Sequence, residues 1–402
     1  MKEYGKYGLP LEVKFCSKCT SSNQRPSSAY EFQQTANDKK VYIPVTAGVC
    51  KACEYAEIKK TIDWNERERE LKDLCDKHRK SDGNFDVLVP GSGGKDGIFV
   101  AHELKHKYGM NPVLTTWAPT MQTSQGRQNF NAWLEMSFAN YMVYQNKHVH
   151  RILTQVAFKE LCHPFQPFII GQKNMAPKLA TQLNIDLIMF GEHDVEFGVN
   201  METMNIPTME VDWFTSENRD LSKIYLGGLP VSELIDRYKF SLSDLEAYLP
   251  LDRDKFKSSG KEFHFYSYYK NWNFHDNYYY AVENSGFMPS SKRLEGGYDK
   301  YASMDDKIDW LHFYTFHTKF GIGRATAATF QEIRAGVITR EEGIALVKRF
   351  DGEFPIEYLN DCLEYMNITE QEFYDITDKS RPDHLWKKEH GAWKLRHPIW
   401  EE

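Results

Sequence analysis

A glycine-rich segment, Pro90–Gly91–Ser92–Gly93–Gly94–Lys95–Asp96, carries residue types that bind phosphate. Glycines let the backbone turn tightly and bring its amide groups close to an anion, because no Cβ stands in the way. A helix that begins after such a turn adds partial positive charge at its N-terminus, and Ser92 and Lys95 add a hydroxyl donor and a cation. Asp96 would repel phosphate unless it orders the loop or holds Mg²⁺. The segment therefore predicts a site for ATP and Mg²⁺, whereas the simpler alternative is a tight turn that only packs a helix on a strand.

The spacing of this segment differs from the Walker A pattern and from Gly-x-Gly-x-x-Gly. Ser-Gly-Gly-x-Asp between a strand and a helix instead resembles the PP-loop of the ATP pyrophosphatase superfamily. That resemblance implies cleavage of ATP between its α and β phosphates and adenylylation of a substrate oxygen. Gly97 departs from the Ser or Thr that usually follows the Asp, so one hydroxyl donor is missing.

The elements that must position this loop alternate between strands and helices. Strands are predicted at 85–89, 112–117 and 186–190, and helices at 63–80, 98–108, 126–145, 150–162 and 174–183. This alternation predicts an α/β fold with a parallel sheet and helices on both faces. Ligands of such sheets lie beyond the carboxyl ends of the strands, so the loops after Val89, Trp117 and Phe190 should share one site.

Polar and aromatic residues near these strand ends extend the predicted site. The superfamily resemblance places adenine near Thr116 and Trp117, although Trp117 equally suits a core. Gly171, Gln172 and Lys173 precede Asn174, which is a natural helix N-cap, and Lys173 could reach the pyrophosphate. After the strand at 186–190, Glu192 could orient ammonia or hold a metal, and His193 could act as an acid or base. The alternative for both segments is solvated or capping side chains.

Two Cys-x-x-Cys pairs, Cys16/Cys19 and Cys50/Cys53, have the spacing of a tetrahedral zinc site. A reducing compartment favours metal over disulfides for such pairs, and a redox pair or free thiols are the alternatives. We expect a structural Zn²⁺ in a zinc-ribbon-like module at residues 1–60. The other three of the seven cysteines are expected to be packing residues.

The chain is predicted to contain two further parts, an ATP-binding domain at 61–220 and a mainly helical substrate or partner region at 221–402. Helices are expected within 231–250, 305–318, 325–350 and 354–380. Arg293 and the segment Lys319–Arg324 combine cations with glycines and could bind a phosphate or carboxylate, or form solvated turns. The aromatic stretch 263–280 is expected to be a partly buried surface, with stacking on a sugar or base as the alternative.

The length, composition and net charge of the chain limit the functions that it can have. The chain has 402 residues, of which 41% are hydrophobic and 27% charged, which is typical of globular proteins. A net charge of -7 argues against general binding of nucleic acid or anionic membranes. No apolar run has the length of a membrane span and no signal peptide is evident, so a cytoplasmic location is expected.

Taken together, several segments resemble the N-acetyl sugar amidotransferases, the PP-loop enzymes of acetamidino-sugar biosynthesis in bacterial surface glycans such as lipopolysaccharide and flagellin glycans. They are the cysteine pairs, 87–96, 163–174, Gly191–Glu192, 319–324 and 339–343. Gly97 and His193 depart from the Ser and Asn expected there.

That resemblance implies a reaction. ATP would adenylylate the oxygen of a sugar N-acetyl group, and ammonia would displace AMP to leave an acetamidine. Lys95, Asp96, Lys173 and Glu192 are the expected catalytic residues. The substrate, an N-acetylated sugar or sugar nucleotide, is expected to contact Asn174, His193, Arg293, Lys319 and Arg324. The chain shows no glutaminase Cys-His pair, so ammonia would come from glutaminase and ammonia-channel partner proteins.

Two other functions stay open on the sequence. A tRNA-thiolation enzyme can combine a PP-loop with a zinc ribbon, but it needs a sulfur-carrying cysteine near ATP, for which Cys162 is the nearby candidate. A degenerate nucleotide-binding scaffold would be consistent with Gly97.

Overall fold

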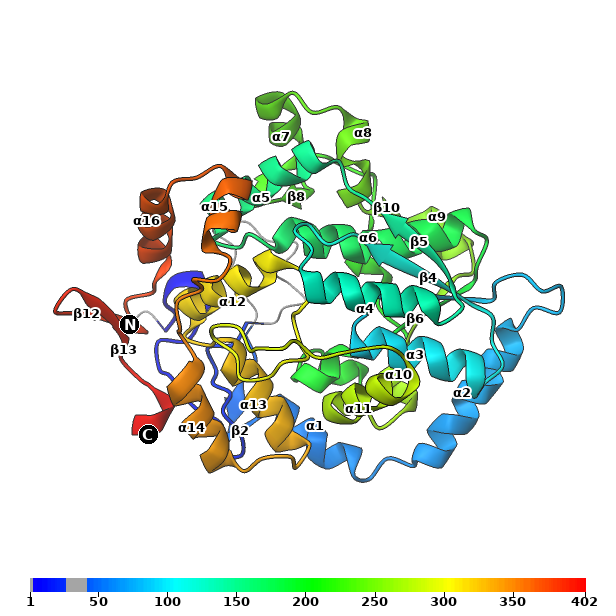
Figure 1. Cartoon of the computed structure of the whole chain (residues 1–402), viewed down its shortest axis with the longest axis horizontal. Helices are drawn as coiled ribbons and strands as arrows, with labels where there is room; N and C mark the ends of the chain where they lie inside the picture. Colours follow the sequence, from blue (N-terminus) through cyan, green and yellow to red (C-terminus); the bar gives the residue numbers. More distant parts are fainter. Residues whose placement is uncertain (1–2, 27–41) are drawn as a thin grey trace.

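A five-stranded parallel sheet forms the centre of the computed structural model, which describes residues 3–26 and 42–402 (Figure 1). The strands lie in the order β11–β6–β3–β4–β5, and every neighbouring pair is parallel. They are β3 (Val87–Pro90), β4 (Pro112–Trp117), β5 (Ala139–Val143), β6 (Leu187–Phe190) and β11 (Glu262–Phe265). The α/β class and the parallel sheet predicted from the sequence are confirmed.

The order of the strands creates a crevice between β3 and β6. From β3 the chain adds β4 and β5 on one side, and it then returns to add β6 and β11 on the other. The connections that leave β3 and β6 therefore run in opposite directions, and the space between them is where open parallel sheets bind ligands. The glycine loop of residues 91–94 and the segment that begins at Gly191 follow these two strands.

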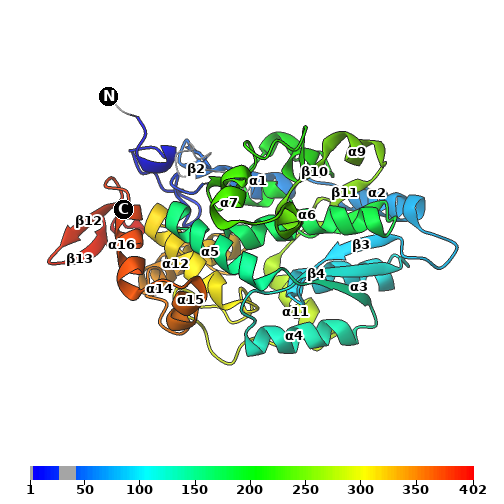
Figure 2. The same cartoon turned by 90° about the horizontal axis from the view of Figure 1, so that it is seen from above.

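Helices cover both faces of the sheet, as predicted. Figure 2 shows α6 above the sheet and α3, α4 and α11 below it. Burial on both sides explains the unbroken apolar run Val87–Val89 in β3, whose three side chains are at most 1% exposed. The helices are α1 (Lys51–Lys59), α2 (Trp64–His78), α3 (Lys95–His106), α4 (Ser124–Glu135), α5 (Lys147–Leu161), α6 (Gln166–Gln182), α7 (Val231–Tyr238), α8 (Leu242–Leu245), α9 (Arg253–Ser258), α10 (Tyr266–Tyr269), α11 (Phe274–Asn284), α12 (Lys307–Phe320), α13 (Arg324–Arg334), α14 (Arg340–Phe350), α15 (Leu359–Met366) and α16 (Glu370–Ser380).

Two helix predictions need correction. The helix predicted at 126–145 is α4 followed by strand β5, and the chain turns between them at Ser137, which has a φ of 62°. β5 is an edge strand with partly exposed side chains, so it lacks the buried apolar run that identifies the central strands. The helix predicted at 174–183 already begins at Gln166 with a proline in its first turn, where a missing amide proton costs nothing. Asn174 is therefore inside α6 and is not an N-cap.

The aromatic stretch 263–280 contributes more to the core than predicted. Phe263 and Phe265 belong to β11, the fifth strand of the sheet, and both are 3% exposed. Tyr266 is fully buried and its ring meets Phe99 edge to face. The sequence prediction of a partly buried surface is wrong for these three residues, because β11 and the start of α10 pack into the central hydrophobic core.

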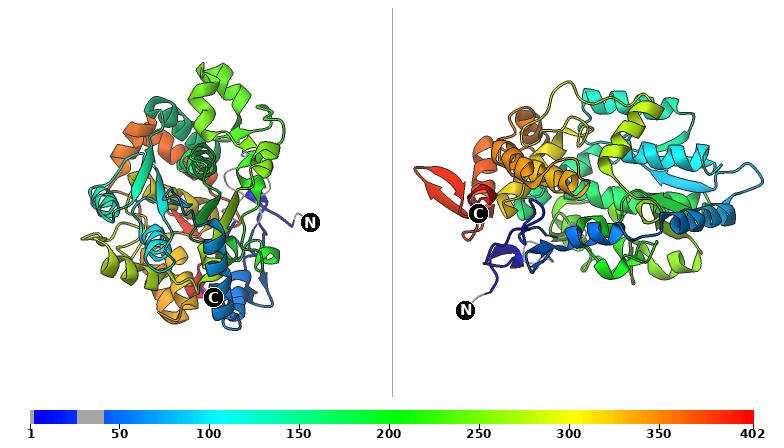
Figure 3. Two further views of the ribbon diagram at one scale, coloured as in Figure 1. Left: turned by 90° about the vertical axis from the view of Figure 1, so that its right-hand side faces the viewer. Right: turned by 90° about the horizontal axis from the view of Figure 1, so that it is seen from below.

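The N-terminal cysteine module, residues 3–26 and 42–60 of the described chain, packs against the C-terminal helices. It contains the hairpin β1 (Val45–Thr46) and β2 (Val49–Cys50) and helix α1. Figure 3 shows its blue trace beside the orange C-terminal helices. The hydroxyls of Thr20 and Thr329 are hydrogen-bonded at 2.8 Å, and the Arg340 Nε donates to the carbonyl oxygens of Cys16 and Cys19 at 3.3 Å.

Further short strands complete the description: the pair β7 (Thr215–Ser216) and β10 (Leu251–Asp252), and the hairpins β8 (Tyr225–Leu226) with β9 (Leu229–Pro230) and β12 (Trp386–Glu389) with β13 (Ala392–Leu395). Among the helices of the described residues, none combines the length and apolarity that a bilayer crossing requires.

Candidate functional site

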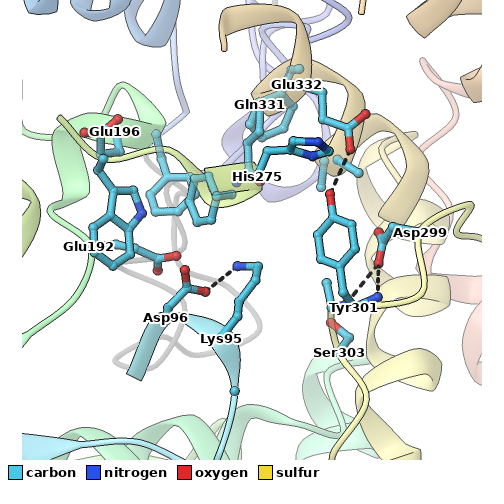
Figure 4. A pocket seen from close by; sticks show the side chains of 18 of the residues that line it. Lys95, Asp96, Glu192, Glu196, His275, Asp299, Tyr301, Ser303, Gln331 and Glu332 are labelled. Carbon is cyan, nitrogen blue, oxygen red and sulfur yellow. Dashed lines mark hydrogen bonds and ion pairs between the residues drawn. The ribbon is translucent and has the colours of Figure 1, made fainter. Parts of the chain in front are cut away.

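A cavity of about 960 Å³ is lined chiefly by three parts of the chain that are far apart in the sequence. They are the segments that follow β3 and β6, the cysteine module, and helices α12 and α13 with the loop before them. Figure 4 shows Asp96 and Glu192 on one side of this cavity and Tyr301 and Glu332 on the other. The loops after β3 and β6 thus meet at one site, as the sequence predicted. The loop that begins after Trp117 does not line the cavity.

The glycine loop is held in its turn by backbone geometry. Gly93 has a φ of +86°, and a Cβ there would lie 2.8 Å from the carbonyl oxygen of Asn129. Only glycine fits this position without strain. The next strand fixes the start of the loop, since the Gly91 amide donates to Thr115 at 2.9 Å and the Thr116 hydroxyl donates to Gly91 at 2.7 Å.

Helix α3 begins directly after this turn, and no described side chain caps it. The first amide groups of a helix have no partner within the helix, so those of Lys95 and Asp96 are available to an anion. Ser92, Gly93 and Gly94 line the cavity together with these two residues. The local geometry therefore fits a phosphate group.

Lys95, Asp96 and Glu192 form a compact charged cluster at the loop. The Lys95 Nζ lies 2.5 Å from Asp96 Oδ2, and the amide of Asn277 donates to Asp96 Oδ1 at 2.8 Å. Lys95 also lies 4.9 Å from the centre of the Phe274 ring, and its side chain is 8% exposed. Asp96 is therefore oriented from two sides and turned toward Glu192, as Figure 4 shows.

Glu192 holds its proton unusually strongly. Burial raises its pKa to about 8, and the negative charge of Asp96 adds to this effect against the opposing charges of Lys95 and Lys173. Lys173 extends from α6 and lies 5.1 Å from the centre of the Phe190 ring. Two carboxyls that resist joint ionisation accept a divalent cation readily, because the cation removes both the repulsion and the desolvation cost.

Five predicted residues at the second and third loops lie in the protein core or outside the cavity lining. Trp117 is 3% exposed and packs edge-on against Tyr248. A Cβ on Gly171 would lie 2.2 Å from the Trp117 ring, so this glycine admits the indole. The Asn174 amide donates to the Tyr248 carbonyl oxygen at 2.7 Å. Gln172 and Thr116 are likewise absent from the cavity lining, and binding roles for this group stay predictions.

His193 has a structural environment. Its Nδ1 accepts from the Val195 amide at 3.2 Å, and its Nε2 lies 3.1 Å from the Ile206 carbonyl oxygen. A ring that accepts at Nδ1 and donates at Nε2 is neutral, and burial lowers its pKa further. His193 therefore caps the short helix at Asp194–Phe197 and does not face the cavity.

Of the C-terminal residues predicted to bind substrate, one lines the cavity and two do not. Arg324 lines the cavity, where its guanidinium lies 3.8 Å from Asp299 and 5.0 Å from the Phe313 ring centre. Arg293 forms a two-point ion pair with Glu353 at 2.6 and 3.0 Å outside the cavity lining, and Lys319 is 1% exposed.

Several cavity residues were missed by the sequence reasoning. Asp305 accepts a hydrogen bond from the hydroxyl of Ser92, and burial raises the pKa of this aspartate. Burial also raises the pKa of Asp309 to about 6. The segment 299–305 carries no motif, and it reaches the loop only through the packing of α12. Glu196 belongs to a polar run that the sequence did single out, without assigning it a role.

The four cysteines of the N-terminal module converge as predicted. Their sulfur atoms all lie within 4.8 Å of one another, and the pairs Cys16/Cys53 and Cys19/Cys50 are each 3.8 Å apart. Four zinc–sulfur bonds of about 2.3 Å at tetrahedral angles require sulfurs about 3.8 Å apart, whereas a disulfide requires about 2.0 Å. Amides of Lys18 and Ser21 donate to two of the sulfurs, which stabilises thiolates. The cluster fits a zinc ion.

The comparisons with known proteins point to glycan chemistry. Residues 295–398 match the family model of the C-terminal domain of WbpG-like LPS biosynthesis proteins. This similarity supports a glycan-biosynthesis family. No curated protein matches the chain. The matched residues include α13 and the end of the preceding loop, so the segment similar to this model forms one wall of the cavity opposite the glycine loop.

Proposed function

We propose that this protein is an ATP-dependent amidotransferase that converts the N-acetyl group of a sugar into an acetamidino group. One observation carries the proposal: the phosphate-type loop and the WbpG-like domain of LPS biosynthesis line the same cavity. A nucleotide at the loop and a sugar at the opposite wall would therefore meet.

The reaction follows from the weakness of an amide as an electrophile. The N-acetyl oxygen attacks the α-phosphorus of ATP, a new O–P bond forms, and pyrophosphate leaves. Ammonia then attacks the activated carbon, AMP leaves with the former acetyl oxygen, and the product is an amidine. The acetyl oxygen thus departs as part of a phosphate ester, which is a far better leaving group than hydroxide.

The cavity residues would act in the first step, the transfer of AMP. The amides of the glycine loop and Lys95 would stabilise the charge that develops on the departing pyrophosphate. Asp96 and Glu192 would hold Mg²⁺, which neutralises the phosphates. Asn277 orients Asp96 for this role through its hydrogen bond. Ammonia would be supplied by a glutaminase partner, because at neutral pH almost all free ammonia is protonated to ammonium, which is not a nucleophile.

Product analysis tests the proposal. The zinc-loaded full chain is incubated with ATP, Mg²⁺, ammonium and N-acetylated sugars, both free and nucleotide-linked. We expect AMP, pyrophosphate and an acetamidino sugar in equal amounts. Asp96→Asn should abolish all three, while Asp254→Asn, an exposed aspartate on α9, should change none. Pyrophosphate release that proceeds equally without sugar, or thiolated RNA as the product, would exclude the proposed reaction.

A further inference from the structure

A second group of charges lines the cavity beyond Glu192. It consists of Arg25 from the cysteine module, Lys59 from α1, Arg334 from α13 and Glu196. Lys59 binds both carboxylate oxygens of Glu196, at 2.9 and 3.1 Å. Glu196 is thereby paired with Lys59, and its charge also acts on Arg334 without a direct ion pair between their side chains.

The two arginines lie close to each other without an acidic partner. Both guanidinium carbons lie over the Phe330 ring, at 4.3 Å for Arg25 and 4.6 Å for Arg334. Arg334 donates through Nη2 to the Glu196 carbonyl oxygen at 3.2 Å, while its Nη1 has no partner. Within residues 3–26 and 42–402, no carboxylate forms an ion pair with either. Burial, together with the charge of Arg334, lowers the pKa of Arg25 to about 9.

The cysteine cluster explains how Arg25 tolerates this position, but it does not use the hydrogen bonds of the guanidinium. A zinc ion with four thiolates carries a formal charge of about -2, which attracts the nearby guanidinium. The four cysteines are at most 4% exposed, and no hydrogen bond joins Arg25 to their sulfurs in the described chain. Arg25 and Arg334 both line the cavity, and Arg334 is compensated by the charge of Glu196 rather than by the cysteines.

We propose that Arg25 and Arg334 form a second anion site, which holds a phosphate group of the acceptor substrate while the glycine loop holds ATP. Planar guanidinium groups bind phosphate oxygens through paired hydrogen bonds, and two of them from different elements suit a diphosphate. Glu196 lies within electrostatic range of both Glu192 and Arg334, so the two anion sites follow one another along one cavity.

This inference rests on the proposed function, since it assigns the phosphate to the sugar acceptor. It selects a phosphorylated or nucleotide-linked sugar over a free one. It also gives the zinc module a role in substrate binding, because that module carries Arg25 and α1 to the cavity wall.

Calorimetry on the zinc-loaded full chain tests the second site. The glycine loop is first saturated with α,β-methylene ATP and Mg²⁺, and uridine 5′-diphosphate is then titrated as the probe. We expect binding by the unmodified chain. Arg25→Gln and Arg334→Gln should each weaken it by about tenfold to a hundredfold, the loss of one charge-assisted interaction. Arg237→Gln, an exposed arginine on α7, is the matched control and should bind as the unmodified chain does.

Two results would overturn the second site. One is equal affinity of the unmodified chain and Arg334→Gln, a change outside the cysteine module whose zinc content is measured in parallel. Another is binding of inorganic pyrophosphate but not of uridine 5′-diphosphate, which would mean that the arginines bind the pyrophosphate released from ATP. Retained binding of the probe by a chain that never forms AMP would refute the proposed reaction and leave the second site standing.

Discussion

The raised pKa of Glu192 gives a prediction about proton release that tests metal binding separately from the reaction with sugar. With a pKa of about 8, Glu192 is about nine-tenths protonated at pH 7. If Asp96 and Glu192 bind Mg²⁺ together, the metal must displace this proton. We therefore expect release of about 0.9 proton for each MgATP bound at pH 7, and about 0.5 at pH 8. Below pH 8, the affinity for MgATP should rise up to about tenfold for each pH unit.

Titration calorimetry in two buffers of different ionisation enthalpy measures this proton directly. Glu192→Gln should release almost none, while Glu283→Gln, an exposed glutamate on α11, should behave as the unmodified chain does. If the nucleotide binds without a metal at Asp96 and Glu192, it adds negative charge near these carboxyls, and its binding would be accompanied by proton uptake. Proton uptake, or undiminished release by Glu192→Gln, would refute the assignment of the metal to Asp96 and Glu192.

The same shift has a consequence for stability. Folding raises the pKa of Glu192 from its ordinary value of 4.5, so the folded chain binds this proton more tightly than the unfolded chain. The contribution of Glu192 to the free energy of unfolding is fully present below pH 4.5 and is lost as the pH rises to about 8. Its direction is thus opposite to that of a carboxylate in a salt bridge.

Three substitutions test other parts of the structure. Gly93→Ala should abolish ATP binding and cost at least about 1–2 kcal/mol of stability, because its φ is +86° and its Cβ would meet Asn129; calorimetric ATP binding that survives would contradict this. Gly97→Ser should raise the rate of pyrophosphate release about tenfold, since a Cβ there meets nothing closer than Gly91 Cα at 3.3 Å and the new hydroxyl can reach phosphate; an unchanged or lower rate would refute it. Cys16→Ser should lower zinc content and melting temperature together, and full zinc by metal analysis would remove the predicted site.

Local sequence was sufficient for the features that depend on neighbouring residues. The glycine loop, the start of the helix predicted at 63–80 and the two Cys-x-x-Cys pairs each need only a few adjacent positions, and the structure places all of them as predicted. The central strands were recognised because burial on both faces requires a continuous apolar run. β5 was missed because an edge strand lacks that run.

The opposite wall of the cavity lay beyond such reasoning. Arg25 and Arg334 are 309 positions apart, and only the packing of the cysteine module on α13 brings them together. Asp305 reaches Ser92 for the same reason. Trp117 illustrates the reverse case, because its type and position suit a ligand contact, whereas the close approach of Gly171 encloses it in the core. Cys162, the sulfur carrier that a thiolation enzyme would need, is 2% exposed and does not line the cavity.

The central step of the proposed reaction is the transfer of AMP to the acetyl oxygen at the glycine loop. A sugar substrate whose N-acetyl oxygen carries a heavy isotope tests this transfer directly. Mass spectrometry of the AMP formed with ammonium and ATP should show the heavy atom in its phosphate. AMP that forms without the label, together with an amidated sugar, would contradict activation of that oxygen by ATP.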